Sequence, residues 1–227
     1  NRLGGGYLYD DNGNLTQTPQ SALTMTYDVE NRMLSATSGS GTEYYVYGPA
    51  NERVWKRIEY SGGGSTNFVY FYGVDGALLT TGGIDNDWDY NVYFAGRQVW
   101  REWTGFSWSM PPMPVSPDRL GSTVKHFPYG DEPTATAPNR EKFATYYRDE
   151  ATALDYARNR YYSSTIARFT TADPYGPSAR PGAPQTWNRY SYAGGDPVNR
   201  NDPSGLYATC DWWDWEDSSQ AVTDPRG

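Results

Sequence analysis

A short motif in which tyrosine is followed by aspartate or glycine recurs along the first half of the chain, at a spacing of about twenty residues. The clearest copies run from Tyr9 to Leu15 and from Tyr27 to Leu34, and looser copies begin at Tyr47, Tyr72 and Tyr93. Asn-Gly and Asp-Gly dipeptides suit tight turns because they tolerate positive φ. Each copy therefore predicts one β-hairpin. A lone hairpin of this size is marginal, so the hairpins are expected to pair edge to edge into one strip of sheet.

Aromatic residues, glycine and proline extend this prediction to the rest of the chain. The 227 residues include 21 Tyr, 9 Trp and 7 Phe against 24 Gly and 16 Pro, which is typical of short strands and tight turns. Segment 149–160 has fair helix propensity, but tyrosine pairs on either side of it favour strands. The proline-rich segment 107–117 predicts a loop or an extended crossing strand. We therefore predict an all-β fold.

Charge and rare residues exclude several classes of function. A formal net charge of -8 and a pI near 4.7 argue against nucleic acid or an anionic membrane surface as the main partner. No apolar run is long enough to predict a membrane span. Cys210, the only cysteine, can form no internal disulfide, and His126, the only histidine, has no neighbour at ligand spacing. We predict no metal site and no cofactor, with His126 in a strand or turn.

Two Asp-Pro-x-Gly sequences carry the candidate chemistry. Proline fixes φ after Asp202 and Gly205 permits positive φ, so Pro203 and Gly205 shape a rigid turn that begins with a carboxylate. A second copy begins at Asp173. Two neighbouring carboxyl groups can divide acid and base roles, one activating water and the other donating a proton. The alternative is that each sequence is only a good turn.

Further short motifs follow in a fixed order between residues 118 and 206. The motifs are Asp118–Ser122, Pro128–Gly130, Arg148–Asp149, Leu154–Tyr156, Ala157–Tyr162, Arg168–Pro174, Asn188–Tyr192 and Pro197–Leu206. With the tyrosine repeats, they make residues 1–206 resemble the C-terminal end of an Rhs/YD-repeat protein with its repeat-associated core module.

The resemblance implies an architecture and an activity. In this family the YD repeats spiral into a hollow β-shell, and in the bacterial members a mostly-β core module closes one end. Similar bacterial modules act as an intramolecular aspartic protease that releases the C-terminal polypeptide. Carried onto this sequence, the resemblance implies Asp202, Asp173 and Arg160 as catalytic residues. It also implies cleavage of the Leu206–Tyr207 bond, by a protease that turns over once.

Arg168 is a second candidate for the arginine role, because it is nearer to Asp173 in the sequence. Pro197 begins the motif that contains the turn at Asp202. One departure from the family pattern is the long turn-rich insert between Gly176 and Pro184. An insert at this place could shift the geometry of the two aspartates.

The resemblance also predicts the organisation of the chain. Residues 1–117 are expected to be YD repeats ending in the proline-rich crossing segment, residues 118–206 the core module, and residues 207–227 the start of a variable segment. The expected partners are shell repeats that precede this chain and the C-terminal cargo. The chain begins inside a repeat, so we expect a fragment of a secreted or cell-surface bacterial protein whose export signal lies outside it.

Two other functions fit the same residues. Tyrosine-rich hairpins with open edges could self-associate into a filament or an adhesive surface layer, with the Asp-Pro-x-Gly turns purely structural. Exposed aromatic side chains could instead bind carbohydrate by stacking, although the core is the more common place for such residues.

Overall fold

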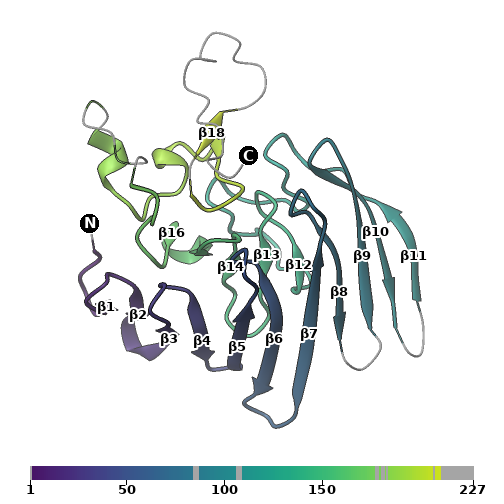
Figure 1. Cartoon of the computed structure of the whole chain (residues 1–227), viewed down its shortest axis with the longest axis horizontal. Coiled ribbons are helices and arrows are strands. Elements are labelled where there is room, and N and C mark those ends of the chain that lie inside the picture. The colour runs from purple at the N-terminus through teal and green to yellow at the C-terminus, as the bar shows by residue number, and fades with distance from the viewer. Residues whose placement is uncertain are drawn as a thin grey trace.

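A single antiparallel sheet of eleven strands occupies the first half of the computed structural model (Figure 1), which describes residues 2–83, 87–105, 109–176, 179, 182, 184–206 and 208–210. The strands pair in chain order, so the sheet is a continuous strip of hairpins, as predicted. They are β1 (Leu8–Tyr9), β2 (Leu15–Gln17), β3 (Leu23–Tyr27), β4 (Met33–Ser38), β5 (Gly41–Tyr47), β6 (Arg53–Tyr60), β7 (Ser65–Tyr72), β8 (Leu78–Gly83), β9 (Trp88–Phe94), β10 (Arg97–Thr104) and β11 (Ser109–Pro114).

The tyrosine motifs form one turn that is repeated along the strip. In the first, the backbone N–H of Asp10 donates to the carbonyl of Asn14 (3.0 Å), and the N–H of Gly13 donates back to the carbonyl of Asp10 (3.1 Å). The same pair of bonds closes the turns 28–32, 48–52 and 73–77. The fourth residue of each turn has positive φ, which explains why glycine or asparagine stands there.

Residues after 117 form a second, irregular β region with two small sheets. Among the described residues, helix is confined to 3₁₀ segments of three or four residues, and no helix is long and apolar enough to cross a lipid bilayer. The elements are β12 (Arg140–Glu141), β13 (Tyr147–Arg148), β14 (Asp155–Tyr156), β15 (Tyr161–Ser163), β16 (Arg168–Phe169), β17 (Arg200–Asn201) and β18 (Thr209–Cys210), with η1 (Pro19–Ser21) in the strip and η2 (Ser164–Ile166), η4 (Pro184–Trp187) and η5 (Ala193–Gly195) after it.

Segment 149–160 thus contains a strand and turns, as the flanking tyrosines predicted. The proline-rich segment differs in part from its prediction: from Ser109 to Pro114 it is the edge strand β11, paired antiparallel with β10. Proline fits there because an edge strand leaves one row of N–H positions without a partner strand. Residues 106–108 lie outside the described part of the chain.

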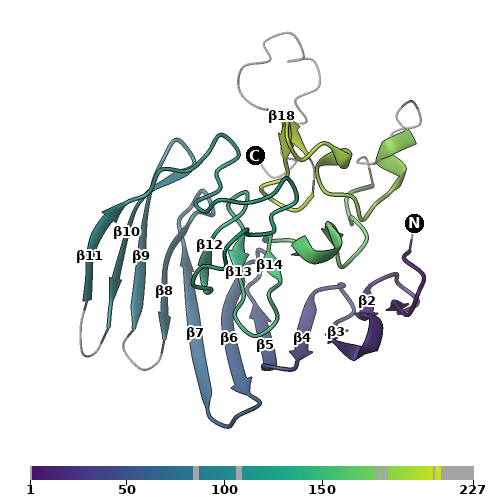
Figure 2. The ribbon, with the colours of Figure 1, turned by 180° about the vertical axis from the view of Figure 1, so that it is seen from behind.

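Residues 118–206, called the module below, lie against one face of the strip (Figures 1 and 2). Tyrosines fill the interface between them: the ring centroids of Tyr45 and Tyr161 are 5.1 Å apart, and those of Tyr70 and Tyr147 are 5.4 Å apart. All four residues are buried. A second aromatic cluster around Phe143 forms the interior of the module. Burial of these large apolar rings is the main force that holds the module on the strip.

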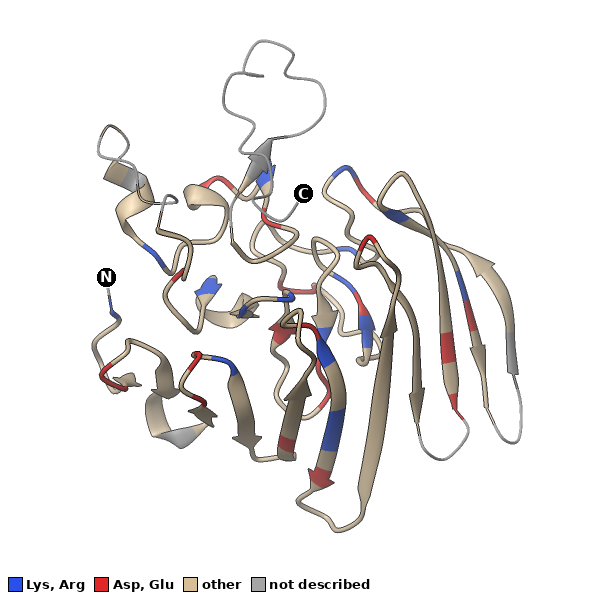
Figure 3. Cartoon of the chain, in the orientation of Figure 1, with Lys and Arg blue, Asp and Glu red and all other residues tan. Residues whose placement is uncertain are grey.

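A buried ionic cluster crosses the same interface. Arg53 and Lys56 of β6 donate to the two carboxylate oxygens of Asp149 in the module, at 2.6 and 2.8 Å. Glu43 of β5 lies 3.6 Å from the Lys56 ammonium and accepts bonds from the N–H of Ala151 (3.1 Å). The side chains of the two cations and both acids have no exposed surface. Figure 3 shows the basic residues of β6 beside the module. Each buried charge therefore depends on its partner across the interface.

A third contact of this interface makes stability depend on pH. The Tyr93 hydroxyl of β9 donates to Glu141 Oε1 in β12 (2.7 Å), while Glu141 Oε2 is buried without a hydrogen-bond partner among the described residues. Burial raises the pKa of Glu141 to about 7 from an ordinary value of 4.5. A carboxyl pKa that is higher in the folded state means that the neutral form fits the fold better. Its contribution to stability is therefore full below pH 4.5 and is lost as the pH rises through 7.

We expect Glu141→Gln to raise the melting temperature at about pH 8 and to leave it unchanged at about pH 4, because Gln keeps a neutral acceptor for Tyr93. Thermal unfolding of both proteins at the two pH values measures this. An equal effect of the substitution at both pH values would show that ionisation of Glu141 is not the cause.

Candidate functional site

The Asp-Pro-x-Gly sequence that begins at Asp202 forms a tight turn at the end of the module. The Asp202 carbonyl accepts the N–H of Gly205 (3.1 Å), and Asp202 Oδ1 accepts the N–H of Leu206 (2.9 Å). Gly205 has a φ of 70°, and a Cβ on it would lie 2.7 Å from the Ala157 carbonyl oxygen. Glycine is therefore required both for the conformation and for the close approach of the turn to the module.

This geometry alone is no evidence of chemistry, because Asp118 makes the same turn. The Asp118 carbonyl accepts the N–H of Gly121 (3.0 Å) and its Oδ1 accepts the N–H of Ser122 (2.8 Å). The surroundings differ. The Asp118 side chain is 42% exposed and lies beside His126, whereas the Asp202 side chain is 3% exposed and lies beside an arginine. Burial and charge, and not the shape of the turn, distinguish Asp202.

Arg160 brings the two predicted aspartates together. It lies between β14 and β15, and its Nη2 is 3.2 Å from Asp202 Oδ2 and 3.9 Å from Asp173 Oδ2. The guanidinium packs over the ring of Phe169 at 3.6 Å. Burial lowers the pKa of Arg160, and the charges of Asp202 and Asp173 partly offset this effect. All three predicted catalytic side chains thus meet in one buried cluster.

Asp173 is fixed mainly through backbone contacts. Its Oδ1 accepts the N–H of Tyr175 (2.8 Å), and its own N–H donates to the carbonyl of Arg189 (2.9 Å). Arg168, the second candidate for the arginine role, donates to Asn188 Oδ1 (3.1 Å) and lies over the ring of Tyr190. Arg160 is therefore the arginine for which the structure gives contacts to both aspartates.

Two further residues hold the Asp202 turn and were not predicted from the sequence. The Tyr146 hydroxyl donates to the Asp202 carbonyl. The backbone N–H and the Nδ2 of Asn159 both donate to the Ser204 carbonyl, at 3.3 and 2.9 Å. Both residues lie in or beside the tyrosine- and arginine-containing motifs of the sequence. They donate to main-chain carbonyls, and such hydrogen bonds cannot be predicted from residue types because every residue carries a carbonyl.

The site holds the peptide bond between Gly205 and Leu206 at both ends. Arg160 Nε donates to the Gly205 carbonyl, and Asp202 Oδ1 accepts the Leu206 N–H. The predicted cleavage point is the next bond, and Tyr207 lies outside the described residues. Pro197, at the start of the motif, is buried. Proline, which has no N–H, fits at position 203 because the turn is closed by the N–H groups of Gly205 and Leu206.

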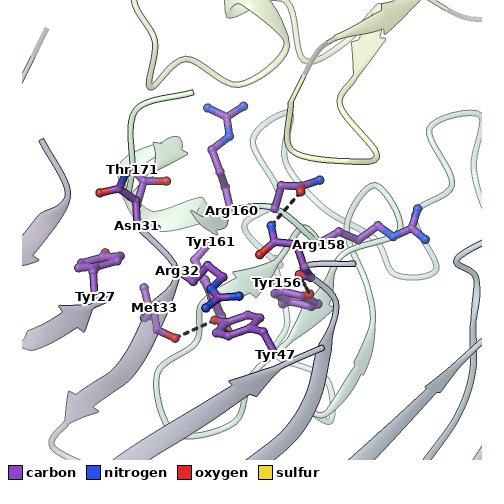
Figure 4. A pocket seen from close by; sticks show the side chains of 12 residues that line it. Tyr27, Asn31, Arg32, Met33, Tyr47, Tyr156, Arg158, Arg160, Tyr161 and Thr171 are labelled. Carbon is purple, nitrogen blue, oxygen red and sulfur yellow. Dashed lines mark hydrogen bonds between the residues drawn. The ribbon is translucent and has the colours of Figure 1, made fainter. Parts of the chain in front are cut away.

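A small pocket lies beside this cluster, where the turns after β3 and β5 meet the module. Figure 4 shows it lined by Tyr27 and Arg32 from the strip and by Tyr156 and Tyr161 from the module. Arg160 also contributes to the lining, but its guanidinium points away from the other side chains in that view. Neither aspartate lines the pocket, so it is separate from the carboxylate cluster.

The structure gives His126 a local role. Its Nε2 lies 2.9 Å from Asp118 Oδ2 and its Nδ1 lies 2.8 Å from the Phe127 carbonyl oxygen. The hydrogen bond with Asp118 raises the pKa of His126. Within the described ranges, no three His, Cys, Asp or Glu side chains gather closely enough to suggest a metal site.

Three curated bacterial proteins are similar to the chain in sequence, although no protein-family model matches it. It is 27% identical over 228 residues to the tRNA3(Ser)-specific nuclease WapA of Bacillus spizizenii. It is 29% identical over 220 residues to the tRNA(Glu)-specific nuclease WapA of Bacillus subtilis subsp. natto, and 27% identical over 215 residues to the tRNA nuclease WapA of Bacillus subtilis. Each match covers 87% of this chain and 9% of the relative. The chain therefore corresponds to a small part of these proteins.

Solved structures share the fold. The crystal structure of TcdB2-TccC3 superposes with a TM-score of 0.68 at 20% identity, covering 88% of this chain and 11% of that chain. The Tc holotoxin pore of Photorhabdus luminescens, with a mutation in TccC3, gives a TM-score of 0.68 at 20% identity, covering 89% and 11%. The chain therefore shares the predicted all-β fold with these solved structures, and the WapA sequences resemble it over most of its length.

Proposed function

We propose that this chain is the end module of an Rhs-type β-shell, and that it cuts its own backbone once to release a C-terminal polypeptide. The observation that carries the proposal is the buried meeting of Asp202, Asp173 and Arg160, which lie far apart in the sequence. Burying two carboxylates and one guanidinium in an aromatic module is costly unless they are paired, and such clusters are frequent at functional sites.

In the proposed reaction, the two aspartates divide the proton transfers. Asp202 accepts hydrogen bonds from Arg160 and from the Leu206 N–H. As the base in this scheme, it takes a proton from a water molecule while the water oxygen adds to the carbonyl carbon of Leu206. The carboxyl group of Asp173 then donates a proton to the nitrogen of residue 207 as the C–N bond breaks. The products are an amine at residue 207 and a carboxyl group at residue 206, which passes its proton to the ionised Asp173 and becomes a carboxylate. Arg160 stabilises the negative charge that develops on the carbonyl oxygen of Leu206 during the addition of water.

The relatives suggest what is released. The similar curated proteins are nucleases by name, and this chain spans 9% of their length. We infer that the chain belongs to a bacterial toxin-delivery protein that is secreted or displayed on the cell surface. Its partners in this proposal are the shell repeats of the same protein and the toxin-like cargo that follows residue 206.

Assembly through open sheet edges is the second candidate function. The strip has two edge strands, β1 and β11, that could pair with another copy. However, β1 contains two residues, and β11 carries prolines at 111, 112 and 114, which cannot donate to a new strand. The edges therefore support filament growth less well than the buried cluster supports self-cleavage.

Intact mass measured over time on freshly translated chain tests the proposal. We expect the full chain to be replaced by two fragments, one that ends at Leu206 and one that begins at Tyr207. The rate should not depend on protein concentration, because the cut is intramolecular. A chain that stays whole would show that the motif is only a turn, and would make the structural function the better interpretation.

A further inference from the structure

Arg189 makes an unusual set of contacts around the first aspartate turn. Its Nη2 donates both to the Asp173 carbonyl and to the Tyr175 carbonyl, the latter at 3.1 Å, so one nitrogen bridges the turn. Its own carbonyl oxygen accepts the Asp173 N–H at 2.9 Å and Arg160 Nη1 at 3.0 Å. Arg189 thus contacts Asp173 on both sides of its α-carbon and links that residue to Arg160.

These contacts act where the site is most weakly held. The distance from Arg160 Nη2 to Asp202 is 3.2 Å, but to Asp173 it is 3.9 Å, which is longer than a hydrogen bond. The position of the Asp173 carboxylate therefore depends on its backbone.

The two aspartate turns are anchored in the same manner by different residues. A side chain from elsewhere in the module donates to the carbonyl of each aspartate: Tyr146 to Asp202 and Arg189 to Asp173. We propose that Arg189 is a positioning residue for the self-cleavage reaction, which holds the Asp173 carboxyl group at the distance from Arg160 and the Asp202 turn at which it can transfer a proton. This role rests on the proposed function, and Arg189 itself touches no reacting atom.

The rate of self-cleavage in freshly translated full chain tests this role, with the wild type, Arg189→Ala and Arg189→Lys compared side by side. We expect Arg189→Ala to slow cleavage about 100-fold, the effect typical of a small misplacement of a catalytic group. Arg189→Lys keeps one cationic donor and is expected to lie between the two. Methylguanidinium added at millimolar concentration is expected to accelerate Arg189→Ala and not the wild type, because it can replace the missing donor.

Arg97→Ala is the matched control, since Arg97 also donates from Nη2 to a backbone carbonyl, that of Arg119 at 3.0 Å, but is exposed and bonds a carbonyl outside both aspartate turns. It is expected to cut at the wild-type rate. If the wild type does not cut, the proposed function fails. If the wild type cuts and Arg189→Ala cuts within about threefold of it, well short of that loss, the positioning role alone fails. A slow variant that methylguanidinium does not accelerate would indicate a general structural role and would also overturn the inference.

Discussion

Asp202→Asn is expected to abolish release of the C-terminal segment while leaving the fold intact. Asparagine keeps a carbonyl oxygen for the Leu206 N–H, so the turn can still close. It cannot take a proton from water, and loss of such a group typically costs on the order of 10²–10⁴-fold in rate. Intact mass over time, with circular dichroism to verify the fold, measures this result. Arg160 keeps its hydrogen bonds to the carbonyl oxygens of Gly205 and Arg189, which limits the structural cost.

Asp118→Asn is the matched control for this experiment. It makes the same exchange in a turn with the same two backbone bonds, but at an exposed position away from Arg160. Cleavage at the wild-type rate is expected. Efficient cutting by the Asp202 variant would contradict the proposed division of roles, and slow cutting by the Asp118 variant would mean that turn stability, and not the carboxylate, limits the reaction.

Asp149→Ala is expected to destabilise the protein more than any other change considered so far. It removes the acid shared by Arg53 and Lys56 and leaves two buried cations with less compensation. Breaking a buried ion pair in this way typically costs about 3–5 kcal/mol. That is a large fraction of the stability of an ordinary domain, and it corresponds to a fall in melting temperature of roughly 10 °C. Urea and thermal unfolding measure the effect.

An exposed ion pair on β6, the strand that carries Arg53 and Lys56, provides the comparison. Arg57 and Glu59 lie 3.0 Å apart with side chains 42% and 45% exposed, so Glu59→Ala should change the free energy of unfolding by about 1 kcal/mol or less. Similar losses for both variants would show that burial does not raise the importance of Asp149. Separation of the module from the strip before global unfolding, seen as two transitions for Asp149→Ala only, would place the lost stability at the interface.

The strip could be predicted from the sequence because its determinants are local. Asp10 and Gly13 lie within one turn, and the requirement for positive φ at the fourth residue is visible in the residue types themselves. The docking of the module could not be predicted in this way. Arg53, Lys56 and Asp149 look like ordinary surface charges in the sequence, and only the folded chain shows that they meet without solvent.

The same distinction applies to the candidate site. Asp173 and Asp202 could be proposed from the rigidity of Asp-Pro-x-Gly, and Arg160 from the resemblance to a known core module. Tyr146 and Arg189 hold the two turns through main-chain carbonyls, for which almost any donor could serve. Such contacts depend on the path of the backbone, so no pattern of residue types predicts them.

The contact between Asp202 and the Leu206 N–H has a consequence for what happens after a cut. The donor belongs to the part of the chain that stays attached to the module, so cutting after residue 206 would not remove it. The new terminus would remain beside Asp202 and Arg160, and its carboxyl group would be the third in the cluster. A spent module would thus be inhibited by its own product. It would be closed to any other polypeptide, including the cargo that it had just set free.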